Sequence, residues 1–149
     1  MGLGLELGGK DPALIRKHAA ENLVDGAMYN SGQSCCGVEN IYVYESTFDA
    51  FLAAAVETAK ECKVGGLLQD DAVNLGPVVN VAAADNIRAR IDDAIKNGAK
   101  LLVDEALFLA AKAKTAFIAP QILVNVDHTM RIMKEKTFGP VVMTKLLRS

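Results

Sequence analysis

Two cysteines stand side by side behind a polar turn, in the stretch Gly32-Gln33-Ser34-Cys35-Cys36. A glycine there lets the backbone turn tightly, so that several amide N–H groups can point toward one place. A thiolate at Cys35 could therefore attack a carbonyl carbon while its own N–H holds the developing oxyanion. We interpret Cys36 as a packing neighbour, because successive side chains do not both face one site. The alternative for Cys35 is a buried structural cysteine, the usual state of an unpaired thiol.

A nucleophile needs a base, and a carboxylate that could act as one stands in Leu5-Glu6-Leu7-Gly8-Gly9-Lys10. Burial beside Leu5 and Leu7 would raise the pKa of Glu6 toward neutrality and suit it to general-base catalysis. The alternative is a solvated glutamate near the start of the chain. The sequence leaves both interpretations of Glu6 open.

The same stretch has a second interpretation, because Gly4 to Lys10 also fits the pattern G-x-x-x-x-G-K of a phosphate-binding loop. In that alternative Lys10 binds a nucleotide with magnesium. Asp11 stands where a magnesium-binding Ser or Thr is expected, and Pro12 stands where a helix should begin, so the pattern argues weakly for it.

Composition limits what surrounds these residues. The chain has 149 residues, is 51% hydrophobic and 23% charged, and carries a net charge of −2, which suits one globular domain. It holds no basic block, no apolar run long enough to span a bilayer and no metal-ligand spacing, so we expect no nucleic acid, no membrane and no metal site. Three cysteines, an odd number, and a start without a signal-peptide pattern indicate the cytoplasm.

Hydrophobic patterning then predicts the elements that must position Cys35 and Glu6. We expect helices over residues 18–30, 46–63 and 81–97, the second capped by Ser46 and the third buried through Ile87, Ile91, Ala94 and Ile95. We expect strands over 13–15 (buried), 40–44, 100–103, 117–126 and 141–146, a long loop over 64–79, a surface excursion over 104–114 and a helical turn at 128–131. Strands that alternate with helices predict an α/β fold with a mainly parallel sheet flanked by helices.

Taken together, these stretches resemble the NAD(P)-dependent aldehyde dehydrogenase superfamily. Three separated motifs carry the resemblance: Glu6-Leu7-Gly8-Gly9-Lys10, Gly32-Gln33-Ser34-Cys35 and Phe138-Gly139-Pro140-Val141. The stretches Leu75-Gly76-Pro77-Val78 and Ala119-Pro120-Gln121-Ile122-Leu123 are also similar to that family.

The resemblance implies an activity and a site. Cys35 would attack an aldehyde, a hydride would pass to NAD or NADP, and Glu6 would activate the water that hydrolyses the thioester. Phe138 would pack near the nicotinamide ribose, and the backbone at Leu7 would lie near the nicotinamide ring. A carboxylate usual in the family is replaced by Lys136, and a lysine cannot accept hydrogen bonds from ribose hydroxyls.

Family members are much longer than this chain, so the resemblance implies a single catalytic domain over residues 1–149, or a fragment of one, without the cofactor-binding domain. A non-catalytic remnant that acts only as a folding or association module is the alternative. The partners expected are a small aldehyde substrate and either a second copy of the chain or a full-length relative.

Overall fold

The fold is organised around one mixed sheet in the order β1-β2-β5-β4-β3. The computed structural model describes residues 9–15, 19–66, 68 and 70–148. Strands β1, β2, β5 and β4 run parallel, and only β3 is antiparallel to its neighbour, so the predicted α/β fold with a mainly parallel sheet is confirmed. The strands are β1 (Asp11–Ile15), β2 (Val38–Tyr44), β3 (Lys100–Leu101), β4 (Gln121–Val124) and β5 (Val141–Leu147).

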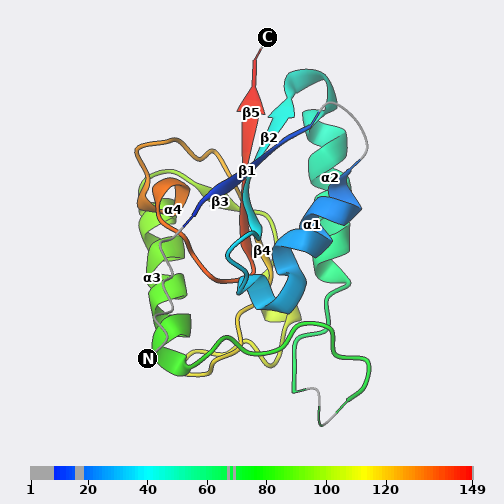
Figure 1. Ribbon diagram of the computed structural model, residues 1–149, viewed down its shortest axis with the longest axis vertical. Helices are drawn as coiled ribbons and strands as arrows, with labels where there is room; N and C mark the ends of the chain where they lie inside the picture. The colour runs from blue at the N-terminus through cyan, green and yellow to red at the C-terminus, as the bar shows by residue number, and fades with distance from the viewer. Residues whose placement is uncertain (1–8, 16–18, 67, 69, 149) are drawn as a thin grey trace, which may run out of the picture.

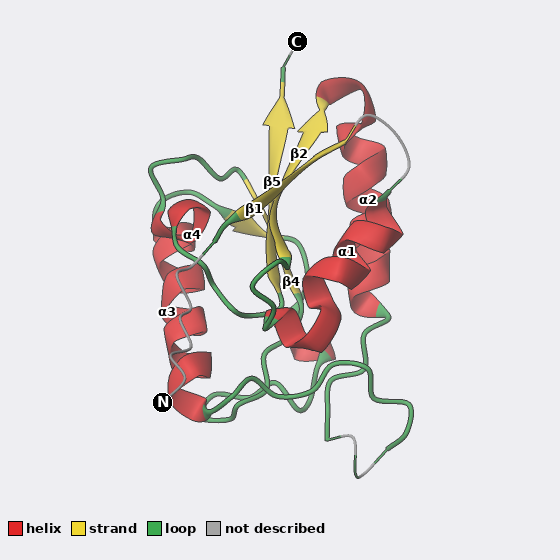
Figure 2. Ribbon diagram, viewed as in Figure 1, coloured by secondary structure: helices red, strands yellow, loops and turns green. Residues whose placement is uncertain are grey.

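Helices cover both faces of this sheet. Figures 1 and 2 show α1 and α2 on one side and α3 and α4 on the other. Alternate residues of β5 face opposite layers, because Val142 packs in the core beneath α1 and α2 while Val141 and Met143 pack in the core beneath α3 and α4. The helices are α1 (Ala20–Met28), α2 (Phe48–Lys60), α3 (Val81–Lys96) and α4 (Arg131–Lys134).

The segments that precede the parallel strands all lie at the same end of the sheet, the end where these strands begin; this end is called the amino edge below. Lys10 precedes β1, Gly37 precedes β2, Pro120 precedes β4 and Pro140 precedes β5. Because these strands run parallel, their amino ends lie together, at the lower end of β2 and β5 in Figure 1. The described parts of the three sequence motifs, which for the first motif are Gly9 and Lys10, therefore adjoin this amino edge. Open α/β sheets usually carry their sites at the carboxyl edge instead.

The prediction of a buried strand over 13–15 is wrong about burial. Strand β1 pairs with β2 alone among the described residues and forms an edge of the sheet, where Leu14 is 62% exposed. An edge strand also tolerates Pro12, since the missing N–H weakens no central ladder. Apolar character alone does not tell an edge strand from a central one.

Two predicted details of the helices are also wrong. Ser46 does not cap α2: the N-cap residue is Thr47, whose hydroxyl instead donates to the carbonyl of Tyr44 at 3.2 Å. Ile95 is 42% exposed because Ala94 occupies the inward position and the next residue is rotated by about 100° around the helix.

The region between α3 and β5 is more irregular than predicted. Strand β3 holds two residues rather than the four expected, and α4 begins at Arg131, where the predicted turn over 128–131 ends. Asp127 makes the turn before α4, because its carboxylate accepts from the N–H of Thr129 at 2.7 Å. The predicted surface excursion is confirmed as a loop with one 3₁₀ turn, Glu105–Leu107.

Replacing Asn80 by alanine should destabilise the fold by about 1 kcal/mol, because its side chain is the N-cap of α3 and accepts from the N–H of Ala83 at 2.8 Å. Urea denaturation measures the change. The matched control is Ser46→Ala, which removes an exposed hydroxyl that caps no helix and should leave the unfolding free energy within about 0.5 kcal/mol. A larger loss at Ser46 than at Asn80 would contradict the observed caps.

Candidate active site

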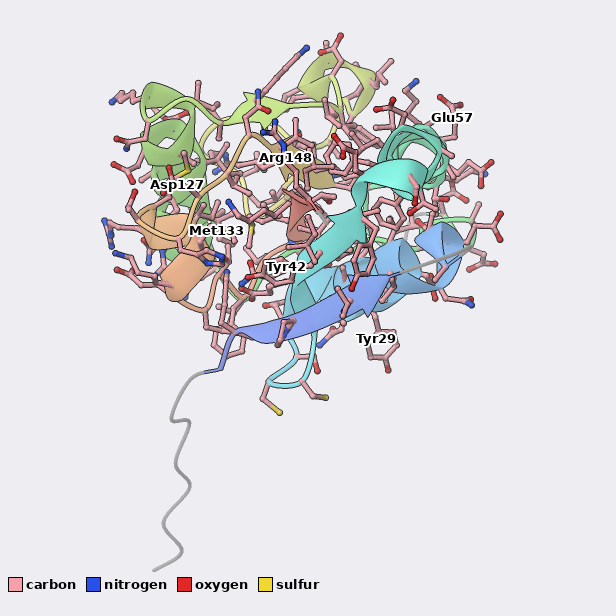
Figure 3. All side chains as sticks on the ribbon, turned by 90° about the horizontal axis from the view of Figure 1, so that it is seen from above. Tyr29, Tyr42, Glu57, Asp127, Met133 and Arg148 are labelled. Carbon is pink, nitrogen blue, oxygen red and sulfur yellow. The ribbon has the colours of Figure 1, made fainter. Side chains whose placement is uncertain are left out.

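The turn that carries the two cysteines begins with an unusual backbone. After α1 the chain enters a 3₁₀ segment, Tyr29–Gly32, in which Asn30, Ser31 and Gly32 have φ values of 49°, 58° and 72°. Figure 3 shows Tyr29 pointing away from the body of the molecule. Residues other than glycine rarely adopt such values, and strained conformations of this kind cluster at functional sites. Helix α1 ends at Met28, two residues before the end predicted for the helix over residues 18–30.

Hydrogen bonds from the long loop hold this strained segment in place. The buried hydroxyl of Ser31 donates to the carbonyl of Gly76 at 2.8 Å, and the side-chain amide of Gln33 donates to the carbonyl of Pro77 at 3.3 Å. The same amide donates to the carbonyl of Asn30 at 3.1 Å. The Gly76-Pro77 stretch of the predicted 64–79 loop therefore supports the backbone that precedes Cys35.

The turn also contacts the loop before β5 backbone to backbone. A Cβ atom added at Gly32 would lie 2.0 Å from the carbonyl oxygen of Gly139. Gly139 is itself pressed against α3, because a Cβ there would lie 2.8 Å from Cδ1 of Ile87. Phe138, half-buried with a φ of 49°, directly precedes this contact. Two of the three sequence motifs therefore meet with no room for a side chain between them.

Both cysteines of the turn are exposed. They occupy a tight turn in which the N–H of Gly37 donates to the carbonyl of Ser34 at 3.2 Å. The interpretation of Cys36 as a packing neighbour is therefore wrong, and so is the alternative of a buried Cys35. At the tip of a turn successive side chains can both face solvent, and Cys36 Sγ lies 3.4 Å from the hydroxyl of Ser34.

Lys10, the last residue of the first motif, forms a buried ion pair with Glu39 of β2. Burial lowers the pKa of Lys10, while the charge of Glu39 and the hydrogen bond to it act in the opposite direction. The phosphate-loop alternative is wrong, since residues 11–15 form a strand instead of a helix and the ammonium group of Lys10 is committed to a carboxylate. Sequence reasoning missed Glu39, which no motif includes.

The ammonium group of Lys136 is held by groups of the protein itself. Its side chain is 4% exposed, and its ammonium group donates to the carbonyl of Gly37 at 3.0 Å. The same nitrogen lies 3.6 Å from a carboxylate oxygen of Glu39 and 5.6 Å from the ring centroid of Phe138. Lys136 thus ties the cysteine turn to the loop before β5.

The third cysteine lies in different surroundings. Cys62 is half-buried just beyond α2, beside a hollow of about 310 Å³ that Asp25 and Glu61 also line. Burial raises the pKa of the Cys62 thiol, and the charges of Asp25 and Glu61 raise it further. Cys62 therefore offers an internal comparison for the exposed Cys35.

Two predicted site residues, Glu6 and Leu7, lie outside the described residues. Within the described part of the chain no group of three metal-binding side chains occurs, and no helix is long and apolar enough to cross a membrane. What the structure does bring together is the Cys35 turn, Phe138 and Lys10.

Comparison with known proteins gives a consistent result. The model of the aldehyde dehydrogenase family matches residues 2–147. The chain is 34% identical over 142 residues to sulfoacetaldehyde dehydrogenase of Neptuniibacter caesariensis, covering 92% of this chain and 30% of that protein. It is 32% identical to lactaldehyde dehydrogenase of Escherichia coli, covering 92% and 29%. The chain thus spans about three tenths of the length of these curated relatives.

Solved structures agree with this result. The crystal structure of the Escherichia coli lactaldehyde dehydrogenase has a TM-score of 0.85 and 30% identity, and the match covers 97% of this chain and 31% of that one. An NADP-dependent glyceraldehyde-3-phosphate dehydrogenase from Bacillus halodurans, complexed with NADP, has a TM-score of 0.83 and 33% identity over 95% of this chain and 29% of that one.

Replacing Gly32 by alanine should destabilise the chain by about 3 kcal/mol or more, because the new methyl group would collide with the carbonyl of Gly139 at a left-handed backbone position. The matched control is Gly26→Ala in α1, where nothing lies within 4 Å of the added carbon. It should stabilise the helix by about 0.5–1 kcal/mol. Equal melting temperatures for the two variants would contradict the Gly32–Gly139 contact.

Proposed function

The chain belongs to the aldehyde dehydrogenase family, and we propose that it supplies the nucleophile for NAD(P)-dependent oxidation of an aldehyde to a carboxylic acid. The observation that carries the proposal is the backbone contact between Gly32 and Gly139 at the amino edge of the sheet. That contact brings the exposed thiol turn beside Phe138. In the proposed reaction Phe138 would contact the bound cofactor, so the thiol and the cofactor would lie close together.

Cys35 is the proposed nucleophile. Its sulfur adds to the aldehyde carbon, a C–S bond forms, and the electron pair of the C=O bond moves to oxygen. The backbone N–H of Cys35 would stabilise that oxyanion by a hydrogen bond. The exposure of Cys35 supports this role, because an aldehyde can reach the sulfur without any rearrangement of the core.

Release of the product is the proposed role of Glu6. When the thiohemiacetal loses hydride, its carbon is oxidised by two electrons and a thioester remains on Cys35. Glu6 then takes a proton from water, the resulting hydroxide attacks the thioester carbon, and the C–S bond breaks to give a carboxylic acid and the free thiolate.

NAD or NADP, when bound, would accept the hydride and so supply the oxidising equivalent of the reaction. On the described part of the chain, Phe138 is the residue that would pack near the nicotinamide ribose. It is half-buried and lies next to the thiol turn. The backbone at Leu7 would lie on the ring side. The ribose would have no acceptor at Lys136, whose ammonium group is committed to Gly37 and Glu39.

The organisation of the protein follows as part of the proposal. Residues 1–149 form a single catalytic domain or part of one, acting in the cytoplasm on a small aldehyde and associating with a second copy or with a full-length relative. No feature of the described residues favours the alternative of an inert association module.

The test is aldehyde-dependent reduction of NAD⁺ or NADP⁺, followed at 340 nm, with the chain and its Cys35→Ala variant. We expect Cys35→Ala to abolish turnover and Cys62→Ala to retain at least half of it, because Cys62 is half-buried just beyond α2 and is not part of the turn over residues 34–37. Turnover that survives in Cys35→Ala would contradict the assignment of the nucleophile.

A second measurement does not depend on bound cofactor. Iodoacetamide should alkylate Cys35 at least tenfold faster than Cys62, because Cys35 is exposed while burial and two carboxylates raise the pKa of Cys62. Butyraldehyde or benzaldehyde should slow the alkylation of Cys35 but not that of Cys62, since only Cys35 forms a stabilised adduct. Peptide mapping by mass spectrometry separates the thiols, and equal protection of both would count against the proposal.

A further inference from the structure

Glu39 is a buried acid that joins segments far apart in the sequence. The carboxylate is 4% exposed, and both of its oxygens accept from the N–H of Thr137 at 3.0 Å. One oxygen also accepts from the N–H of Phe138 at 3.2 Å, and the other binds the ammonium group of Lys10. A carboxylate is this deeply buried only when its charge and lone pairs are satisfied.

A second ammonium group extends the network to the thiol turn. Lys136 lies 3.6 Å from Glu39 and donates to the carbonyl of Gly37, the residue that closes the turn of Cys35. The end of the first motif, the turn of Cys35 and the loop of Phe138 therefore all connect to the carboxylate of Glu39, directly or through one lysine.

We infer that Glu39 is a positioning residue for the reaction proposed above: its carboxylate holds Phe138 and the turn of Cys35 in fixed relative places. The inference rests on the proposed function. Glu39 itself is buried in the network and acts on the aldehyde only through the segments that it holds.

The charges of Lys10 and Lys136 explain why a neutral residue at position 39 would not hold these segments in place. Within the described residues Glu39 is the only acid that forms an ion pair with Lys10 or with Lys136. Glutamine at this position would keep the size and one acceptor oxygen but would leave two buried ammonium groups without a counter-charge. One ammonium group would then turn toward solvent, and the backbone bonds to Thr137 and Phe138 would open.

The test compares the chain with Glu39→Gln by amide hydrogen exchange and by aldehyde protection of Cys35. Exchange at Thr137 and Phe138 should become at least tenfold faster, while amides in the middle of β5 keep their rates. The benzaldehyde concentration that halves the alkylation rate of Cys35 should rise at least threefold, because a loosened turn would hold the N–H of Cys35 less firmly against the oxyanion of the adduct.

Lys136→Met gives a second route if Glu39→Gln does not fold. This change leaves the pair of Lys10 and Glu39 neutral but removes the bond to Gly37. It should weaken benzaldehyde protection at least threefold while Thr137 exchanges as before. The matched control is Lys134→Met in α4, an exposed position with the same change of charge, which should alter neither measurement.

The outcomes separate this inference from the proposed function. If amide exchange at Thr137 and Phe138 were unchanged in Glu39→Gln, the inference that Glu39 holds these residues in place would be wrong. If exchange became faster but benzaldehyde protected Cys35 as before, Glu39 would be a purely structural residue and not a positioning residue for the reaction. If benzaldehyde gave no protection of Cys35 in the unaltered chain, the proposed function would fail, while the exchange rates would still decide whether Glu39 holds the two segments.

Discussion

The contact between Gly32 and Gly139 leaves no space for even one additional carbon atom, and the arrangement of the site depends on it. Gly32 ends a left-handed segment and Gly139 begins the approach to β5, so the contact joins the thiol turn to the central strand of the sheet. Ile87 of α3 packs so closely on Gly139 that it leaves no room for a side chain there either. A helix on one face of the sheet thereby fixes a turn that follows a helix on the opposite face.

Much of the fold could be predicted because it depends on local pattern. Apolar residues at helical spacing located the long helices, and the order of helices and strands predicted a mainly parallel sheet. Burial was harder to predict, since Leu14 is exposed only because β1 has a neighbour on one side, a fact that no local pattern contains. The prediction that Ser46 caps α2 was also wrong. The N-cap residue is Thr47, and its hydroxyl donates to the carbonyl of Tyr44, so no side chain caps the first turn of the helix.

The residues of the candidate site could be proposed from their types and motifs, but the contacts between them could not be predicted. Cys35, Phe138 and Lys10 stand in recognisable motifs, whereas Glu39 stands in none. Its partners are 29 and 98 residues away in the sequence, so only the tertiary fold brings them within hydrogen-bond distance. Lys136 shows the same limit, because its chemistry excludes it as an acceptor but gives no hint that it would donate to Gly37. The exposure of Cys36 depended on the shape of one turn.

Among the described strands of the sheet, the central strand β5 comes after the other four along the chain, which has a kinetic consequence. It joins β2 to β4, and its two faces contribute Val142 to one core and Val141 to the other, so neither core is complete before β5 is in place. Pairing β2 with β5 closes a loop of about a hundred residues, and contacts of such high contact order form slowly. Until then β2 and β4 each present an unpaired edge. Folding of this sheet therefore waits for β5, and until β5 is paired the sheet is most exposed to aggregation.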